Sequence, residues 1–286
     1  MKKIIALIIA IIMLLSCSIL LTGCGADKGS KGVKVVDVKL TEEEYAFGVR
    51  KDDEDLLKKV NEFIAKIKED GTFDEICNKY FGEGTPEAVQ SATLDESKDQ
   101  LVIATNAGFE PFEYMSGDKY LGIDMEIAKL LADYLGKELV INNMDFDAVC
   151  LSVGQGKCDI AMAGLTIKED RKEYVNFSDK YYDAAQKLIV KANDTKFDNC
   201  KAAADVEAIL KGLSSDKKIG VQQGTTGQFY VEGDADWGFD GYAATCVPYK
   251  SGSLAVQDML NGNIDYVIID EAPAQCITEA TNKLNQ

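Results

Sequence analysis

Asp270 and the pair Thr225–Thr226 are polar residues at the ends of predicted buried elements. Asp270 ends the apolar run Tyr266–Asp270, which is typical of a buried strand. A carboxylate there can pair with a cation in a poorly solvated cleft, although such an aspartate also commonly caps the next helix. Thr225 and Thr226 follow Gly224 at the start of a predicted helix, where hydroxyls and free N–H groups bind an anion or cap the helix.

The charge balance excludes several classes of function. The chain has 31 basic and 48 acidic residues and a formal net charge of -17, so phosphate-rich nucleic acid would be repelled. It contains no histidine, which removes Ser–His nucleophile pairs and His-ligated zinc. We therefore predict no catalytic residues, no metal site, no cofactor and no nucleic-acid partner.

The N-terminus reads as a secretory signal. Two lysines precede the apolar stretch Ile4–Leu21, and Leu21-Thr-Gly-Cys24 resembles the bacterial lipobox, in which cleavage precedes a lipidated cysteine. We expect residues 1–23 to be the signal, residues 24–32 to be a flexible tether, and Cys24 to carry a lipid on the outer face of the bacterial cell membrane. A spanning helix is the alternative, because about 18 apolar residues approach the membrane-crossing threshold.

Six further cysteines remain once Cys17 and Cys24 are set aside. An extracytoplasmic location permits disulfides, but no CxxC pair occurs and most of these cysteines have apolar neighbours. Buried free thiols are the simpler interpretation, and Cys246 with Cys276 is the candidate bridge.

Apolar periodicity predicts an α/β chain with an N-terminal helical part. Residues 53–69 carry apolar side chains on one helical face, a second helix spans 73–81, and residues 82–100 are polar and form a linker. Short apolar strands then alternate with helices to the C-terminus, which indicates parallel strands joined by crossovers. The strands are expected at 101–105, 139–142, 159–163, 188–190, 218–221, 244–247 and 266–269, and the helices at 123–135, 146–153, 206–213, from 226, 254–260 and 272–284.

From Leu101 onward the sequence resembles the polar amino-acid family of ABC-transporter solute-binding proteins. The resemblance rests on runs in consistent order: Ala104-Thr-Asn-Ala-Gly-Phe-Glu-Pro-Phe-Glu113, Gly122-Ile-Asp-Met-Glu126, Asp159-Ile-Ala-Met-Ala-Gly-Leu-Thr-Ile-Lys-Glu-Asp-Arg171, Asn176-Phe-Ser-Asp-Lys-Tyr-Tyr182, Gly220-Val-Gln-Gln-Gly-Thr-Thr226 and Asp265-Tyr-Val-Ile-Ile-Asp270. It implies a type 2 periplasmic-binding-protein-like α/β fold of two lobes, each a mostly parallel sheet flanked by helices.

The order of segments departs from that family. Residues 33–82, with Leu40-Thr-Glu-Glu-Glu-Tyr-Ala-Phe-Gly-Val-Arg50, look like the segment that ordinarily ends such proteins, yet here they come first. We expect a circular permutation in which residues 83–100 join the usual termini, since surface termini that lie close together tolerate it. A trimmed tandem duplication would give the same sequence.

The permutation sets the expected lobe map. Residues 45–190 form the first lobe, and residues 191–286 with the strand 33–38 form the second. Hinge crossings are expected near 39–44 and 191–193, which attaches the tether to the second lobe.

The resemblance also implies a site for an amino-acid zwitterion. Arg171 matches the position that pairs with the α-carboxylate, a role for which its planar, always charged fork is suited. Thr166 and the backbone at Gly164 are expected to complete this cradle, with Thr225 and Thr226 contributing from the other lobe. Asp270 matches the partner of the α-ammonium group.

The side-chain pocket gives a weaker indication. Phe109 and Phe146 match positions whose rings flank the ligand, although buried aromatics are more often plain core. Asn106 stands where receptors of this type for basic amino acids and glutamine commonly have Asp, and Gln222 approaches from the other lobe. These neutral amides favour an uncharged polar ligand, an interpretation that the nearby acids Glu110 and Glu113 would reverse.

The function expected from the resemblance is therefore capture of a free polar L-amino acid by a monomeric, lipid-anchored extracytoplasmic protein, and its delivery to an ABC permease. The alternatives are a dehydratase acting on cyclic carboxylic acids on the same fold, which needs a positioned acid or base, and a ligand-sensing module for a membrane partner.

Overall fold

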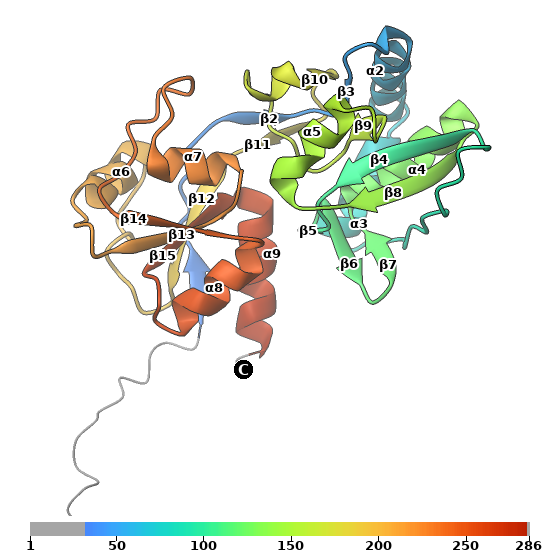
Figure 1. Cartoon of the computed structure of the whole chain (residues 1–286). Coiled ribbons are helices and arrows are strands. Elements are labelled where there is room, and N and C mark those ends of the chain that lie inside the picture. The colour runs from blue at the N-terminus through green and yellow to red at the C-terminus, as the bar shows by residue number, and fades with distance from the viewer. Residues whose placement is uncertain (1–31, 285–286) are drawn as a thin grey trace, which may run out of the picture.

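The computed structural model describes residues 32–284 and consists of two lobes joined by a two-stranded connection (Figure 1). Each lobe is built on a five-stranded sheet, and together the two lobes confirm the predicted α/β architecture. The predicted signal, the tether and Cys24 lie outside the described residues. Within residues 32–284 there is no helix of sufficient length and apolar character to cross a membrane.

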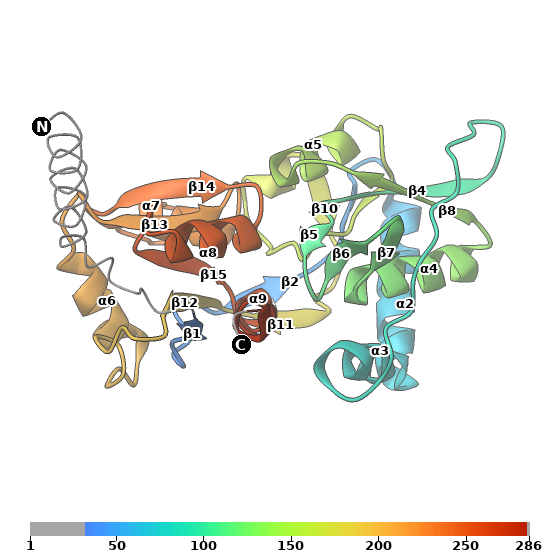
Figure 2. The ribbon, with the colours of Figure 1, turned by 90° about the horizontal axis from the view of Figure 1, so that it is seen from below.

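The second lobe contains the N-terminal strand and the C-terminal part of the chain. Its strand order is β1 (Val33–Val35), β12 (Gln186–Lys191), β15 (Tyr266–Asp270), β13 (Lys218–Gln222) and β14 (Thr245–Tyr249). Helices α6 (Ala203–Lys211) and α7 (Thr226–Glu232) cover one face, and α8 (Gly252–Leu260) and α9 (Glu271–Leu284) cover the other (Figures 1 and 2). Both faces of this sheet are therefore buried.

The first lobe has the strand order β10 (Val175–Phe177), β3 (Gly48–Arg50), β9 (Ile160–Ala161), β4 (Gln100–Thr105) and β8 (Glu138–Asn143). Its helices are α2 (Glu54–Glu69), α3 (Thr72–Phe81), α4 (Ile123–Leu135) and α5 (Val149–Gly154), the last preceded by the short turn η1 (Phe146–Ala148). A small sheet of β5 (Gly108–Phe109), β6 (Glu113–Ser116) and β7 (Lys119–Leu121) stands beside the cleft.

Helix α2 illustrates how local sequence signals match the tertiary fold. Asp53 accepts a hydrogen bond from the N–H of Leu56 as its N-cap, and its first turn is acidic while its last turn is basic. Its apolar face, predicted from the sequence, is buried against the lobe. The two helices at the front of the chain are thus integral to the first lobe, where β3 lies in the interior of the sheet between β10 and β9.

Each large sheet is mixed rather than mostly parallel. In the second lobe β13 runs parallel to β14 and β15, whereas β12 is antiparallel to both β1 and β15. In the first lobe β4 is parallel to β8 and β9, whereas β3 is antiparallel to both β9 and β10. The strands that reverse direction lie on the two crossing segments of the chain, since a segment returning from the other lobe enters its sheet from the opposite end.

The predicted position of the second crossing is wrong. The chain returns at β11 (Tyr182–Ala184), which pairs with β2 (Glu43–Tyr45), and not near 191–193. Strand β12, which we had assigned to the first lobe, lies between β1 and β15 in the second. Its apolar residues fit a buried strand in either lobe, so periodicity could not assign it to one. Figure 1 shows β2 and β11 running between the two lobes.

The linker at 83–100 is more than a covalent bridge, which corrects our expectation. The backbones of Val89 and Tyr120 form an antiparallel bridge, and the N–H of Ala92 donates to Leu139 O at 2.8 Å. The Oγ of Ser91 accepts a bond from the N–H of Ile141, and Val89 is only 5% exposed. The segment therefore lies along the edge of β8 and contributes to the core.

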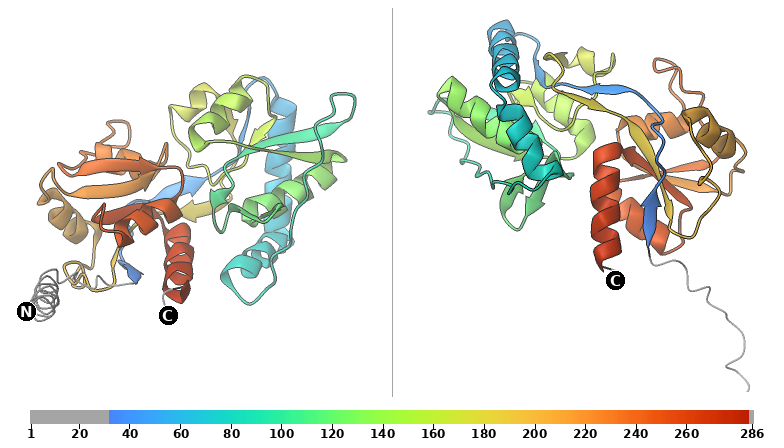
Figure 3. Two further views of the ribbon diagram at one scale, coloured as in Figure 1. Left: turned by 60° about the horizontal axis from the view of Figure 1, so that its bottom comes forward. Right: turned by 180° about the vertical axis from the view of Figure 1, so that it is seen from behind.

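The first described strand is close to the C-terminal helix. Asn282 of α9 accepts from the N–H of Val33 and donates to its carbonyl, both at 2.9 Å. Strand β1 is an edge strand with the single neighbour β12, so it is less enclosed than the buried strand we expected. Figure 3 shows β1 and α9 on the same side of the second lobe.

The candidate bridge between Cys246 and Cys276 is not formed, and the six cysteines in the described part of the chain have free thiols. Cys246 lies on β14 at one edge of the second-lobe sheet. Cys276 lies on α9, which packs on β1, β12 and β15. The intervening strands separate the two thiols.

Candidate ligand-binding site

Nine of the ten predicted site residues line one small pocket between the lobes: Phe109, Phe146, Gly164, Thr166, Arg171, Gln222, Thr225, Thr226 and Asp270. The first five come from the first lobe, and the last four come from the second. The tenth, Asn106, contacts this group through a hydrogen bond from Nε2 of Gln222 at 3.2 Å. Segments up to 161 residues apart in the chain, from Phe109 to Asp270, thus converge on one enclosed space, which the lobes close from both sides.

Arg171 is held in place at the boundary between the lobes. It begins the 3-10 turn η2 (Arg171–Glu173), and its side chain is buried. Nη1 donates to Thr166 O at 2.7 Å and Nη2 donates across the cleft to Gly224 O at 3.1 Å, while the guanidinium lies 5.2 Å from the ring centre of Phe146. Two of its five N–H groups are used in this way, which leaves a fixed cation with further donors.

Gly164 must be glycine because its backbone is left-handed and close to an aromatic ring. Its φ is +51°, and a Cβ there would lie 2.9 Å from Cε1 of Phe109. Its N–H donates to the Oδ2 of Asp124 at 2.9 Å. Burial raises the pKa of Asp124 to about 7. The N–H of Gly164 is thus already donated within the first lobe.

The threonine hydroxyls also have hydrogen-bond partners within the protein. Thr166 Oγ1 donates to Oε2 of Glu43 at 2.7 Å, and Thr225 Oγ1 donates to Gln222 O at 2.8 Å. A hydroxyl has one proton to give, so in this arrangement these two oxygens serve as acceptors toward a ligand. Thr226 Oγ1 makes only a long contact of 3.4 Å to Thr166 Oγ1, which leaves Arg171 and Thr226 as the principal donors to an anion.

Asp270 ends β15 inside the pocket and has a second acid nearby. Its Oδ1 accepts a short hydrogen bond from the hydroxyl of Tyr45. Burial, and next the charge of Glu43, raise the pKa of Asp270 to about 7. Desolvation, and next the charge of Asp270, raise the pKa of Tyr45 well above its usual value, so the phenol keeps its proton and donates it.

Glu43 is a buried acid that sequence reasoning missed. It lies on β2 and is 4% exposed. Its Oε1 accepts from Thr41 Oγ1 at 2.6 Å and from Nε2 of Gln186 at 3.0 Å. The run Glu42-Glu43-Glu44 reads as a solvated charge cluster, and its sequence gives no sign of burial. In the structure β2 alternates buried Glu43, exposed Glu44 and buried Tyr45.

The amides at the side-chain end of the pocket are partly free. Asn106 Nδ2 donates to Met144 O at 2.7 Å, and its Oδ1 accepts from Gln222. Gln222 is 1% exposed, and within residues 32–284 its Oε1 has no hydrogen-bond partner. A buried unpaired acceptor is costly, so this oxygen is positioned to accept a hydrogen bond from a ligand donor.

Neither of the two nearby acids lines the pocket. Glu113 is fully buried, and burial followed by the charge of Asp124 raises its pKa well above the usual value. Glu110 lies in an outer groove with α8 and α9, and burial raises its pKa. Among residues 32–284, Asp270 is therefore the single acid that lines the pocket, whose lining also includes the amide of Gln222 and the rings of Phe109 and Phe146.

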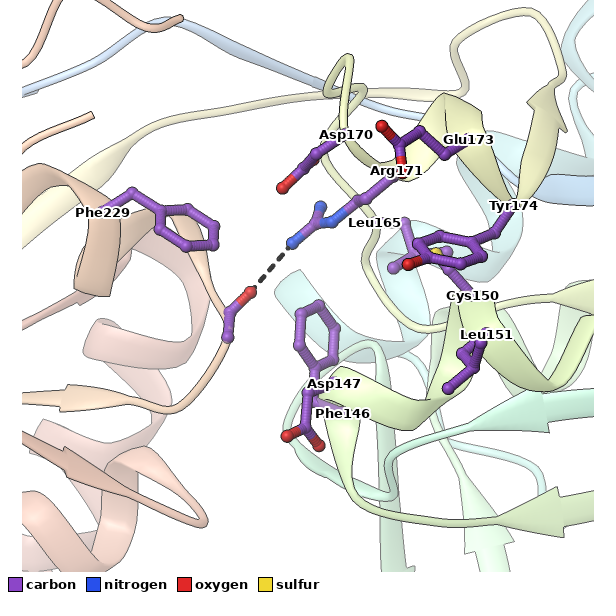
Figure 4. Close-up of a pocket in the computed structure, with 11 residues that line it drawn as sticks. Phe146, Asp147, Cys150, Leu151, Leu165, Asp170, Arg171, Glu173, Tyr174 and Phe229 are labelled. Carbon is purple, nitrogen blue, oxygen red and sulfur yellow. Dashed lines mark hydrogen bonds between the residues drawn. The ribbon is translucent and has the colours of Figure 1, made fainter. Parts of the chain in front are cut away.

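An outer cavity adjoins the pocket and shares Phe146 and Arg171 with it (Figure 4). Figure 4 shows Arg171 extending between Phe229 of the second lobe and Phe146 and Tyr174 of the first, with its hydrogen bond across the cleft dashed. Asp147, Asp170 and Glu173 add acids to this cavity.

The chain thus folds into two lobes with a small polar pocket between them. A family model of the bacterial extracellular solute-binding proteins, family 3, matches residues 7–83 and 101–270. The chain therefore belongs to this family.

Several relatives are named as binding proteins. The arginine-binding extracellular protein ArtP of Bacillus subtilis is 35% identical over 131 residues, which is 46% of this chain and 47% of the relative. The histidine-binding periplasmic protein of Escherichia coli is 28% identical over 173 residues, which is 60% of this chain and 61% of the relative. The match spans between about half and two thirds of the length of these curated relatives.

Solved structures agree with the fold. An ancestral arginine-binding protein bound to arginine has a TM-score of 0.54 and 33% sequence identity, and the match covers 66% of this chain and 77% of that one. Its similarity confirms the periplasmic-binding-protein type of α/β fold for this chain.

Proposed function

We propose that this protein binds a free polar L-amino acid between its lobes and delivers it to an ABC importer. The observation that carries the proposal is the convergence of Arg171 and Asp270 in one enclosed pocket between the two lobes. A fixed cation and a carboxylate on opposite lobes match the two charges of a zwitterion, so a ligand that bridges them stabilises the closed arrangement.

The donors and acceptors orient the ligand. Arg171 offers its remaining N–H groups to the α-carboxylate, with Thr226 on the opposite lobe. Asp270, together with the acceptor oxygens of Thr166 and Thr225, suits an α-ammonium group. This arrangement places the ligand side chain toward Phe109, Phe146 and the amides.

The unpaired Oε1 of Gln222 favours a side chain with an N–H donor. Glutamine, histidine and arginine all carry one, and the relatives include proteins named for binding arginine and histidine. We retain the interpretation that the pocket recognises the ligand side chain through neutral groups, since no acid lines its side-chain end.

A thermal-shift screen of the twenty amino acids followed by isothermal titration tests this proposal. A ligand at about 100-fold over its dissociation constant adds about 2.7 kcal/mol to the free energy of unfolding. We expect stabilisation by amino acids whose side chain donates an N–H, and none by amino acids that have an alkyl side chain. If no amino acid raises the melting temperature, the proposal is wrong.

We also propose that Cys24 carries a lipid that holds the mature, monomeric protein at the outer face of the cell membrane. The lipobox-like residues Leu21–Cys24 support this location. A Cys24→Ser variant is expected to partition into the aqueous phase of a detergent extraction while the natural chain partitions with lipid.

We propose further that the chain is a circularly permuted member of its family. Two observations support it: residues 33–81 are built into both lobes, and Val33 contacts Asn282 near the other end of the described chain. A variant that starts at Asp99, continues to Leu284 and joins by a short linker to Val33–Glu83 restores the usual order. It is expected to fold and to bind the same ligand, whereas an unfolded product would contradict the permutation.

A further inference from the structure

Two buried acids lie at the pocket: Asp270 lines it, and Glu43 is connected to it through Thr166. Both residues are 4% exposed. Gln186 of β12 donates to Glu43, and its backbone is in register with Asp270. Among residues 32–284 neither acid forms an ion pair with lysine or arginine.

The surrounding groups do not compensate this charge. From β2, Tyr45 donates its phenol proton to Asp270. From β6, Glu113 adds a further acid close enough for its pKa to be raised by Asp270, after burial and Asp124. Arg171 lines the same pocket but bonds to Thr166 O and Gly224 O. Lys187 of β12 is paired with Asp37 and Glu271 instead.

We propose that the buried carboxyl of Asp270, supported by the neighbouring charge of Glu43, is a cation site that carries one proton in the ligand-free protein and exchanges it for the α-ammonium group of the ligand. This rests on the proposed amino-acid binding and makes Glu43 a positioning residue for it. Two carboxylates cannot both stay ionised in a buried site without a cation, so one proton satisfies the pair until an ammonium group arrives. The displaced proton is then taken up by the buffer, so that charge is conserved.

Glu43 contributes to the exchange in two ways. Its charge favours the protonated form of Asp270. Its Oε2 accepts a hydrogen bond from the hydroxyl of Thr166, so that Thr166 Oγ1 is left as an acceptor facing the ligand. A purely structural role would need only the hydrogen bonds. The exchange needs the charge.

The sign of the pH dependence follows from the free protein. With a pKa of about 7 for Asp270, lowering the pH from 7.5 to 5.5 increases the protonated fraction that a ligand must displace. For one proton released, the dissociation constant is expected to rise roughly 25-fold over that interval. Affinity is thus highest above the pKa of the free site and declines below it.

The test is isothermal titration with L-arginine and with L-glutamine in buffers of different ionisation enthalpy. At pH 6 we expect release of about one proton per ligand bound. Glu43→Gln keeps the size and the acceptor oxygen of the side chain, and it is expected to reduce both the proton release and the pH dependence. Glu44→Gln, which removes the neighbouring exposed acid that pairs with Lys180, is the matched control and should behave as the natural chain.

The two proposals fail in different ways. Tight binding without proton release and without pH dependence would overturn the exchange and leave amino-acid binding intact. Carboxyl NMR of the ligand-free protein tests the exchange even if neither amino acid binds, because the carboxyl of Asp270 should titrate near neutral pH. Full ionisation of Asp270 at pH 5.5 would overturn it.

Discussion

Lys168 of the first lobe and Asp234 of the second form an ion pair across the cleft, with Nζ 3.1 Å from Oδ2. The lysine side chain is 4% exposed, and its ammonium also lies 4.4 Å from the ring centre of Phe229. Asp170 in the first lobe is its second carboxylate partner. One buried lysine of the first lobe therefore contacts both a carboxylate and an aromatic ring of the second.

We expect Lys168→Met to weaken ligand binding by favouring the open arrangement of the lobes. Losing a buried, hydrogen-bonded charge pair across an interface mainly accelerates dissociation, so the dissociation constant should rise about tenfold or more, with little change in the association rate. Stopped-flow kinetics measures both rates. Lys172→Met, which removes an exposed lysine paired with Glu169, is the control, and equal kinetics for the two variants would exclude the contact as a closing device.

Arg171→Ala should abolish measurable amino-acid binding while the protein stays folded. A carboxylate left without its cation in a buried site generally costs about 3 to 5 kcal/mol, which is a loss of more than 100-fold in affinity. Arg171→Lys keeps the charge and loses the fork, so an intermediate affinity is expected. Titration calorimetry compares both with Arg50→Ala, which alters a partly exposed arginine of the same lobe that does not line the pocket. Near-wild-type affinity in Arg171→Ala would place the ligand elsewhere.

Asp270→Asn keeps the shape of the side chain and removes its charge. We expect it to weaken binding of an α-amino acid much more than binding of the corresponding α-hydroxy acid, because only the former needs a charged partner. The ratio of the two losses is the measurement. Glu271→Gln alters the next residue, whose carboxylate pairs with Lys187 and Lys39, and should leave that ratio at one. Equal losses for both ligand classes in Asp270→Asn would make Asp270 a helix cap only.

Gly164→Ala should introduce both backbone strain and a clash with Phe109. An alanine at Gly117 should introduce the backbone strain alone, so it separates the two effects. Gly164 and Gly117 both have positive φ, at +51° and +66°, but a Cβ at Gly117 meets nothing within 4 Å whereas one at Gly164 meets the ring of Phe109. Both alanine variants should lose about 1 to 2 kcal/mol of stability from the left-handed backbone. Only Gly164→Ala should also lose ligand affinity, since it displaces Phe109. Chemical denaturation and calorimetry on both variants distinguish the two effects.

Cleavage of the linker tests whether the N-terminal segment is part of both lobes. A protease site inserted after Ser97, an exposed position, would separate β1, β2, β3, α2 and α3 from the rest of the chain. Because these elements pair with strands of three sheets, the two fragments should coelute on gel filtration and retain ligand binding. Some stability should be lost with the contacts that hold Val89 and Ala92. Separation of the fragments without denaturant would contradict this.

The sequence alone predicted the main elements and most of the residues that line the pocket. Helix α4 spans Ile123–Leu135 as its periodicity predicts, and Arg171, Thr226 and Asp270 were selected by motif and position before any geometry was known. These predictions succeed because helical and strand periodicity and glycine-bounded turns are local properties of the chain. Motif resemblance then assigned roles that no local property supplies.

Tertiary structure alone decided which lobe β12 joins and that Glu43 lies next to the site. It also decided which acceptors the hydroxyls of Thr166 and Thr225 donate to. The acidic run around Glu43 is indistinguishable from a solvated face until β2 pairs with β11 and turns alternate side chains inward. Strand pairing between segments more than a hundred residues apart depends on the packing of the whole core. Local sequence preferences therefore do not predict which acid is buried. Burial lowers the screening by water, and for this reason the charge of Glu43 affects the pKa of Asp270.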